Sequence, residues 1–255
     1  MISPPTAHSA QDTGTSTFHD RMRRAAYEAK TIVAKYSVLA LPAARRRGHG
    51  VVLDDRTAIL IEGYPRSANN FAVAAFLMAQ PSPVPVAHHV HAPGHVIAAA
   101  RRGVPALVLV REPEEAVLEF VIRNPYLAIG QALRGYARFY GPLLPYRDGF
   151  VVGSFDEVTT DFGAVIRRVN ERFGTRFHPF EHTESNVRAC FEEIEHHYRT
   201  VWGSGPSLER IVARPSAARD AIKDDLRGAY RDPGLARPRE AAQGLFESLR
   251  KQPKT

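Results

Sequence analysis

The 255-residue sequence contains a single cysteine, Cys190, which excludes an intrachain disulfide framework. It also lacks any run close to the roughly 18 apolar residues that a membrane-spanning helix needs. Residues 23–47 loosely imitate a signal peptide, but Lys30 and Lys35 interrupt the segment, and it begins well inside the chain. We therefore predict a cytoplasmic protein with no membrane span.

Acidic residues are in the minority, because 34 Lys and Arg stand against 27 Asp and Glu and give a formal net charge of +7. Such an excess favours anionic partners in general, including nucleotides, phosphate or sulfate groups, nucleic acid and acidic lipid. Most of the basic residues are arginines, whose planar fork suits oxyanions. Aromatic residues interleaved with basic ones on one face are not apparent, so we predict no nucleic-acid partner.

Strand-like and helical patterns alternate along most of the chain. The strand-like runs lie at 58–63, 84–89, 105–111 and 150–155. The helical patterns lie at about 19–38, 69–80, 94–102, 114–123, 128–144, 161–173, 186–201 and 216–229. This alternation predicts an α/β fold in three layers, with a central parallel sheet covered by helices on both faces. We expect a disordered tail at 1–17, a helix and basic linker at 18–50, the main domain at 51–230 and a loosely attached helix and tail at 231–255.

The segment Gly-Tyr-Pro-Arg-Ser-Ala-Asn-Asn at 63–70 has the spacing of a phosphate-binding loop. A strand that ends at Gly63 and a helix that begins near Ala68 would present backbone N–H groups and the positive end of the helix dipole to an anion. The Lys and Ser/Thr that bind the phosphates and Mg²⁺ of a nucleoside triphosphate are replaced by Asn69 and Asn70. The loop therefore predicts a phosphate site without magnesium, in which Arg66 supplies the charge. The alternative is a tight strand-to-helix turn with an incidental arginine.

Residues 64–71 resemble the 5′-phosphosulfate loop of sulfotransferases, whose pattern is aromatic, Pro, Lys/Arg, Ser, Gly, Thr/Asn, Thr, aromatic. Ala68 stands at the glycine position. The resemblance implies a P-loop NTPase-like fold and the co-substrate 3′-phosphoadenosine 5′-phosphosulfate (PAPS), used without a metal. It implies that the donor is bound by Arg66, Ser67, Ala68, Asn69, Asn70 and Phe71.

The strand end at Arg111 resembles the 3′-phosphate motif of the same family, in which Arg precedes Pro by two residues and Ser by eight. Arg111 would bind the 3′-phosphate through a charge-assisted contact. Glu119 stands at the serine position, where a carboxylate repels a phosphate unless a cation neutralises it. Arg123, four residues on, lies on the same helical face and is the candidate partner. An ordinary strand-to-helix junction with a surface arginine is the alternative.

The stretch His-Val-His-Ala-Pro at 89–93 resembles the family's Lys-Thr-His-x-Pro segment, which places the general base at His91. Alternation along a strand puts His89 and His91 on one side. Some branches of the family use a carboxylate base instead. Two other interpretations are a zinc site at His88, His89, His91 and His95, which no Cys or carboxylate cluster accompanies, and histidines that merely end a strand.

Phe-Asp-Glu-Val at 155–158 is similar to the family's Tyr-Glu-Asp-Leu turn, so the resemblance covers about 57–175. The family's Arg-Lys-Gly phosphate clamp is absent, and Arg214 and Arg219 are candidates to replace it. The sequence thus predicts a sulfotransferase that transfers a sulfuryl group in line to a hydroxyl or amine of a small-molecule or glycan acceptor. The alternatives are a catalytically inactive relative that binds PAPS or its desulfated product and, less favoured, a P-loop small-molecule kinase.

Overall fold

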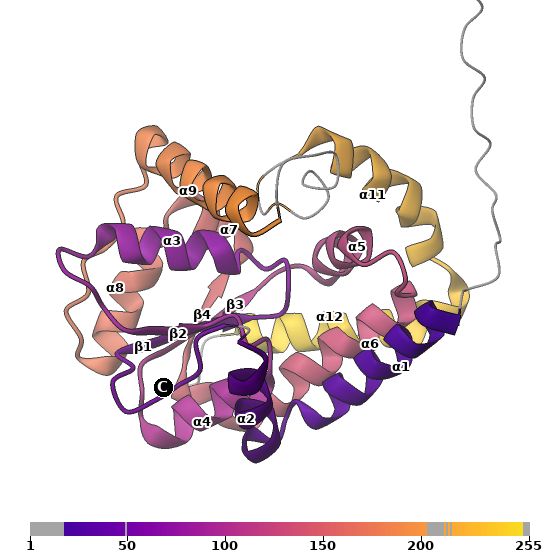
Figure 1. Ribbon diagram of the computed structural model, residues 1–255, viewed down its shortest axis with the longest axis horizontal. Coiled ribbons are helices and arrows are strands. Elements are labelled where there is room, and N and C mark those ends of the chain that lie inside the picture. Colours follow the sequence, from indigo (N-terminus) through magenta and orange to yellow (C-terminus); the bar gives the residue numbers. More distant parts are fainter. Residues whose placement is uncertain (1–17, 49, 203–211, 213, 215, 252–255) are drawn as a thin grey trace, which may run out of the picture.

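A four-stranded parallel sheet in the order β2-β1-β3-β4 forms the centre of the protein (Figure 1). The computed structural model describes residues 18–48, 50–202, 212, 214 and 216–251, so the tail expected at 1–17 lies outside the described residues. The strands are β1 (Ile59–Gly63), β2 (Val86–His88), β3 (Ala106–Val110) and β4 (Val151–Ser154). Because all four run the same way, their carboxyl ends meet at one edge, where ligands bind in open α/β sheets.

Helices cover both faces of the sheet, as the alternation of patterns predicts. Figure 1 shows α3 (Asn69–Ala79), α8 (Phe162–Phe173) and α9 (Glu184–Trp202) on one face, and α4 (Pro93–Arg102), α6 (Ile129–Tyr140) and α12 (Ala236–Arg250) on the other. The remaining elements are α1 (Phe18–Val33), α2 (Ser37–Arg47), α5 (Pro113–Arg123), η1 (Gly141–Gly149), α7 (Phe155–Thr160), α11 (Ala217–Tyr230) and η2 (Pro233–Leu235). The predicted three-layer α/β/α arrangement with a parallel sheet is confirmed.

Two apolar cores lie on the two faces of the sheet. Side chains alternate along the strands, so that Leu60 and Val108 join the core with α4, α6 and α12, while Ile61 and Leu109 join the core with α3 and α8. Strands buried on both faces read as continuous apolar runs, and this is why 58–61 and 105–110 lack polar alternation. The exception within β1 is Glu62, which is fully buried.

Local sequence signals fix where the helices begin. Pro113 occupies the first turn of α5, where its missing N–H has no partner to lose, and the side chain of Glu112 accepts a hydrogen bond from the Glu115 N–H at 3.2 Å. The turn predicted at 155–158 is the start of α7. There Ser154 and Glu157 form a capping box, with the Ser154 N–H 2.9 Å from a Glu157 oxygen.

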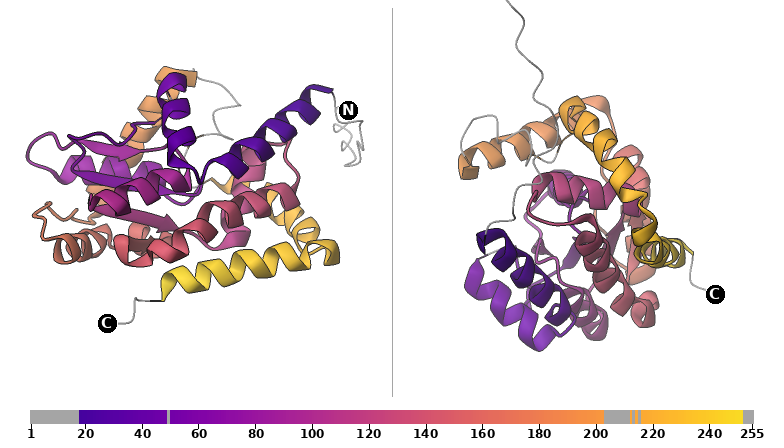
Figure 2. Two further views of the ribbon diagram at one scale, coloured as in Figure 1. Left: turned by 90° about the horizontal axis from the view of Figure 1, so that it is seen from below. Right: turned by 90° about the vertical axis from the view of Figure 1, so that its right-hand side faces the viewer.

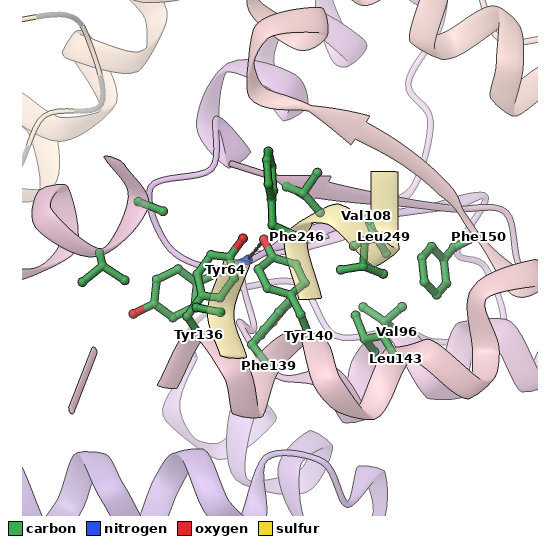
Figure 3. Close-up of a cluster of buried hydrophobic side chains, with 14 of the residues drawn as sticks. Tyr64, Val96, Val108, Tyr136, Phe139, Tyr140, Leu143, Phe150, Phe246 and Leu249 are labelled. Carbon is green, nitrogen blue, oxygen red and sulfur yellow. Dashed lines mark hydrogen bonds between the residues drawn. The ribbon is translucent and has the colours of Figure 1, made fainter. Parts of the chain in front are cut away.

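Two predictions about the ends of the chain are wrong in part. Residues 18–50 contain two helices, because α2 continues through Arg47 and takes up most of the expected basic linker. A helix was expected within 231–255, but α12 is not loosely attached: it packs against α6 and buries Phe246 and Leu249 beside Tyr140 (Figure 3). The main domain therefore extends to at least residue 250.

Candidate functional site

The loop between β1 and α3 turns tightly. A side chain at Gly63 would bring a Cβ to 2.6 Å from the Leu109 carbonyl oxygen, so only glycine fits there. Arg66 and Ala68 adopt left-handed backbone angles, with φ of 72° and 67°. This conformation costs an alanine about 1–2 kcal/mol relative to the right-handed one. The first N–H that bonds back to the loop within α3 is that of Ala72, to the Ala68 carbonyl at 2.9 Å, so the preceding amides have no helical partner.

Tyr64 anchors the loop in the core. Its ring packs 5.2 Å from that of Tyr136, and its hydroxyl donates to the Ala132 carbonyl at 3.1 Å. Its N–H donates to the Tyr140 hydroxyl at 3.2 Å, and that hydroxyl donates to the Leu109 carbonyl at 2.6 Å (Figure 3). Burial raises the pKa of both Tyr64 and Tyr140, so both remain protonated donors. The loop conformation is therefore set by buried hydrogen bonds before any ligand arrives.

The polar side chains that follow Arg66 in the loop bind the protein itself. Ser67 is fully buried, with its Oγ 3.5 Å from the Tyr140 hydroxyl. Asn69 donates to the Tyr64 carbonyl at 3.0 Å, and its buried Oδ1 has no hydrogen-bond partner. Asn70 donates to the Tyr198 hydroxyl at 3.1 Å. These three side chains shape the loop, so the groups that an anion can use are the backbone amides at the start of α3 and the Arg66 guanidinium.

A buried cluster of one carboxylate and three cations lies beside the loop. Glu119 of α5 is 2.9 Å from the Arg66 guanidinium and 3.3 and 3.2 Å from Arg219 and Lys223 of α11. Burial alone would raise the pKa of Glu119, but these three cations outweigh it and lower that pKa to about 2. The carboxylate is therefore ionised. The neutralisation that the sequence suggests does occur, but through these residues, while Arg123 donates to the Tyr198 hydroxyl at 3.1 Å.

Arg111, which directly follows β3, lies against the loop. Its Nη1 donates to the Arg66 carbonyl at 3.1 Å, and its Nη2 lies 3.3 Å from a Glu115 oxygen. The guanidinium also stacks on the Phe155 ring, 4.0 Å from the ring centre. The fold thus brings together Arg66 and Arg111, which are far apart in sequence.

Glu62 organises the histidine segment that follows β2. Its Oε2 accepts hydrogen bonds at 3.0 Å from the N–H groups of Val90 and His91 and from Nδ1 of His95. His95 must donate through Nδ1 because its Nε2 accepts from the Leu53 N–H at 3.0 Å. Burial would raise the pKa of Glu62, but the His95 hydrogen bond and the nearby histidines lower it. The ionised carboxylate of Glu62 therefore holds the segment from Val90 to His95 in place.

The position of His91 suits a general base. Its Nδ1 lies 2.9 Å from the Gly63 carbonyl, which can only accept, so Nδ1 carries the proton and Nε2 is left as an acceptor. The Oε1 atom of Glu62, which has no hydrogen-bond partner, lies 3.6 Å from the same Nδ1. Burial lowers the pKa of His91 below its ordinary 6.5, and Glu62 only partly offsets this effect. The imidazole is therefore neutral near pH 7.

The other histidines of the segment are committed to structural contacts. His89 lies 2.6 Å from the Asn70 Oδ1 through Nε2 and 2.6 Å from Nδ1 of His88. Burial and the neighbouring histidines lower the pKa of His89 to about 3. Both nitrogens of His95 are also bonded to the protein. Within the described part of the chain, no group of three or more His, Cys, Asp or Glu could hold a metal ion.

The loop between β1 and α3, His91 and Arg111 line one pocket, which has a volume of about 990 Å³. Arg66, Ala68, His91 and Arg111 all line it, as do Asn69, Asn70 and Phe71, whereas Ser67 does not. Basic side chains outnumber acidic ones in its lining, where the only carboxylates among the described residues are those of Glu119 and Asp220. The lining cations are Arg23, Lys30, Arg47, Arg66, Arg111, Arg123, Arg138, Arg214, Arg219 and Lys223. The pocket is large enough for a nucleotide, and its charge favours an anionic one.

Comparisons with known proteins give little further information. No protein-family model matches the sequence, and no curated protein does. Among solved structures, the chain is similar to mouse sulfotransferase SULT7A1 complexed with PAP, with a TM-score of 0.41 and 12% identity, over 78% of this chain and 91% of that one. At that TM-score the likeness is too weak to bear on function, which depends on the residues of the pocket.

Sequence reasoning missed two residues of the site. Glu62 had a detectable signal, because it is a charged residue in an otherwise apolar strand and such residues are rarely buried unless paired. Lys223 had none, because its place beside Glu119 depends on how α11 packs against α5. Of the two arginines suggested as a replacement clamp, Arg219 reaches Glu119 and Arg214 lines the pocket.

Proposed function

We propose that this protein transfers a sulfuryl group from PAPS to a hydroxyl or amine of a small-molecule or glycan acceptor, without a divalent metal. One observation carries the proposal: His91, whose Nε2 is unprotonated, and the amide-rich loop with Arg66 line a single cation-rich pocket. A neutral base and an anion-binding loop in one pocket are what such a transfer needs, because it removes one proton and releases one anionic leaving group.

In this mechanism the hydroxyl oxygen or amine nitrogen of the acceptor molecule attacks sulfur, opposite the bridging oxygen of the donor. At the same time Nε2 of His91 takes up the proton that the attacking group loses. The bond between sulfur and that oxygen breaks, and its electron pair leaves with adenosine 3′,5′-bisphosphate (PAP). Charge develops on the departing oxygen, where Arg66 and the amides at the start of α3 stabilise it. The new charge on His91 lies 3.6 Å from Glu62, which favours the protonated imidazole.

Arg66→Ala tests this proposal in a transfer assay with radiolabelled PAPS and a broad acceptor panel. Loss of one oxyanion-stabilising contact is expected to lower turnover by about 10²–10³. Arg176→Ala is the matched control, because Arg176 is exposed and does not line the pocket, and its activity should equal that of the wild type. Equal turnover for Arg66→Ala and the wild type would contradict the assignment.

A catalytically inactive relative that binds PAPS or PAP is the second candidate. The observation that favours it is Glu119, whose carboxylate already pairs with Arg66, Arg219 and Lys223 and would compete with a phosphate for them. Such a protein would be stabilised by PAP yet would transfer no label from PAPS to any acceptor. The transfer assay therefore distinguishes the active enzyme from the inactive relative, even if both bind PAP with the same affinity.

A further inference from the structure

The first helix carries an apolar stripe that the described part of the protein does not cover. Phe18, Met22, Ala25, Ala29 and Ile32 recur every three or four residues, so they lie on one face of α1. All five are exposed, with Phe18 and Met22 at 80% and 55%. The opposite face of α1 packs inward, and there the Tyr27 ring lies 5.8 Å from Phe120.

Further exposed apolar side chains follow in α2. Val38 and Leu39, in its first turn, are 79% and 55% exposed. Seven of the twelve exposed large apolar side chains among the described residues lie within 18–39, and together they form what we call the N-terminal apolar face: Phe18, Met22, Ile32, Val33, Tyr36, Val38 and Leu39. In the left view of Figure 2 the two indigo helices lie along the same, upper side of the molecule.

Most of the chain's excess positive charge is carried by the same two helices. Residues 18–48 contain eight Lys and Arg against Asp20 and Glu28, whereas the whole chain has a net charge of +7. Glu28 is itself paired with Arg134 and Arg138 of α6. Three of these basic residues, Arg23, Lys30 and Arg47, line the pocket described above, and the other five are Arg21, Arg24, Lys35, Arg45 and Arg46.

The combination of exposed apolar side chains and positive charge indicates the chemistry of a binding partner. A second copy of the same face would bring like charges together, which opposes self-association. An anionic lipid surface satisfies both features, because apolar side chains enter the boundary between headgroups and acyl chains while Lys and Arg contact lipid phosphates. No helix in the described ranges is long and apolar enough to cross a membrane. We propose that α1 and α2 dock the protein onto the surface of an anionic membrane through the N-terminal apolar face. The proposal does not depend on the transferase function.

Vesicle co-sedimentation tests it with the full chain. The wild type should sediment with phosphatidylcholine vesicles that contain phosphatidylglycerol and remain free with phosphatidylcholine alone, and added salt should weaken the binding. Met22→Glu combined with Ile32→Glu should reduce partitioning at least about tenfold, because two large apolar side chains no longer enter the lipid. Glutamate is a good helix former, so α1 should persist. Leu77→Glu on α3, which is 43% exposed, is the matched control and should bind like the wild type.

A second pair of variants separates charge from apolar burial. Arg21→Gln and Arg46→Gln should each weaken binding about fivefold, which corresponds to about 1 kcal/mol per basic residue near an anionic surface. Arg176→Gln, at an exposed site away from α1 and α2, should have no effect. The proposal is overturned if the wild type does not sediment with anionic vesicles at low salt. It is also overturned if the variant with Met22→Glu and Ile32→Glu binds the vesicles as well as the Leu77→Glu control does. It is equally overturned if light scattering shows a dimer that this double substitution dissociates while vesicle binding is absent.

Discussion

Replacing Glu119 by Gln should lower the free energy of unfolding by about 3 kcal/mol at pH 7. Glutamine keeps the shape of the side chain but leaves Arg66, Arg219 and Lys223 gathered around a group without charge. The magnitude follows from the pKa of Glu119, about 2 against an ordinary 4.5, at 1.36 kcal/mol per pH unit. Breaking a buried ion pair by removing one partner has similar costs, about 3–5 kcal/mol. Urea unfolding of the two proteins measures the difference.

The pH dependence of that difference provides the check. Because the folded-state pKa of Glu119 is depressed, its stabilisation is complete above about pH 4.5 and is lost as the pH falls through about 2. The gap between wild type and Glu119→Gln should therefore narrow across this window. Glu193→Gln, an exposed carboxylate on α9, is the control and should change stability very little. A Glu119→Gln protein as stable as the Glu193→Gln protein at pH 7 would show that the carboxylate does not hold the three cations together.

His91→Ala should reduce sulfuryl transfer by about 10²–10⁴, the range typical of a lost general base. Since burial lowers the pKa of His91 below 6.5, the wild-type rate should be constant around neutral pH and should fall only on the acid side, where the imidazole gains a proton. The residual activity of His91→Ala should lack that acid limb. Rate measurements across the pH range with labelled PAPS decide this.

His178→Ala is the control for the substitution at His91, because His178 is exposed and its hydrogen bonds to Gln80 use only its backbone. It should keep the wild-type rate and pH profile. If His91→Ala retained the acid limb, another group would be the base. A protein that still gains stability from PAP after the substitution would show that the loss is catalytic and not one of folding.

Much of the fold could be predicted because its signals are local. The alternation of apolar runs with helical patterns gave the three layers, and Gly63 with the residues that follow it marked the turn from β1 into α3. The packing of the C-terminal helix was missed because the Pro, Arg and Lys around 231–255 suggested a loosely attached helix and tail. Phe246 and Leu249 belong to a helical apolar stripe that needs α6 to be buried.

The site was harder to predict because its charges meet across the fold. The rule that residues four apart on a helix can pair suggested Arg123 as the partner of Glu119. That rule says nothing about residues that lie about a hundred positions away in the sequence. Arg219 and Lys223 reach that carboxylate only because α11 packs on α5. Likewise, the loop motif predicted Ser67, Asn69 and Asn70 as ligands, whereas packing directs their side chains to Tyr140, Tyr64 and Tyr198.

The central claim is that the loop at 63–70 and the start of α3 bind the phosphosulfate end of an adenylate donor without a divalent ion. Thermal melting with PAP in the presence of EDTA tests it most directly. PAP at 100 times its dissociation constant should add about 2.7 kcal/mol to the stability of the wild type, and much less to that of Arg66→Ala. An unchanged melting temperature with PAP, or stabilisation by ATP that appears only with Mg²⁺, would contradict the account.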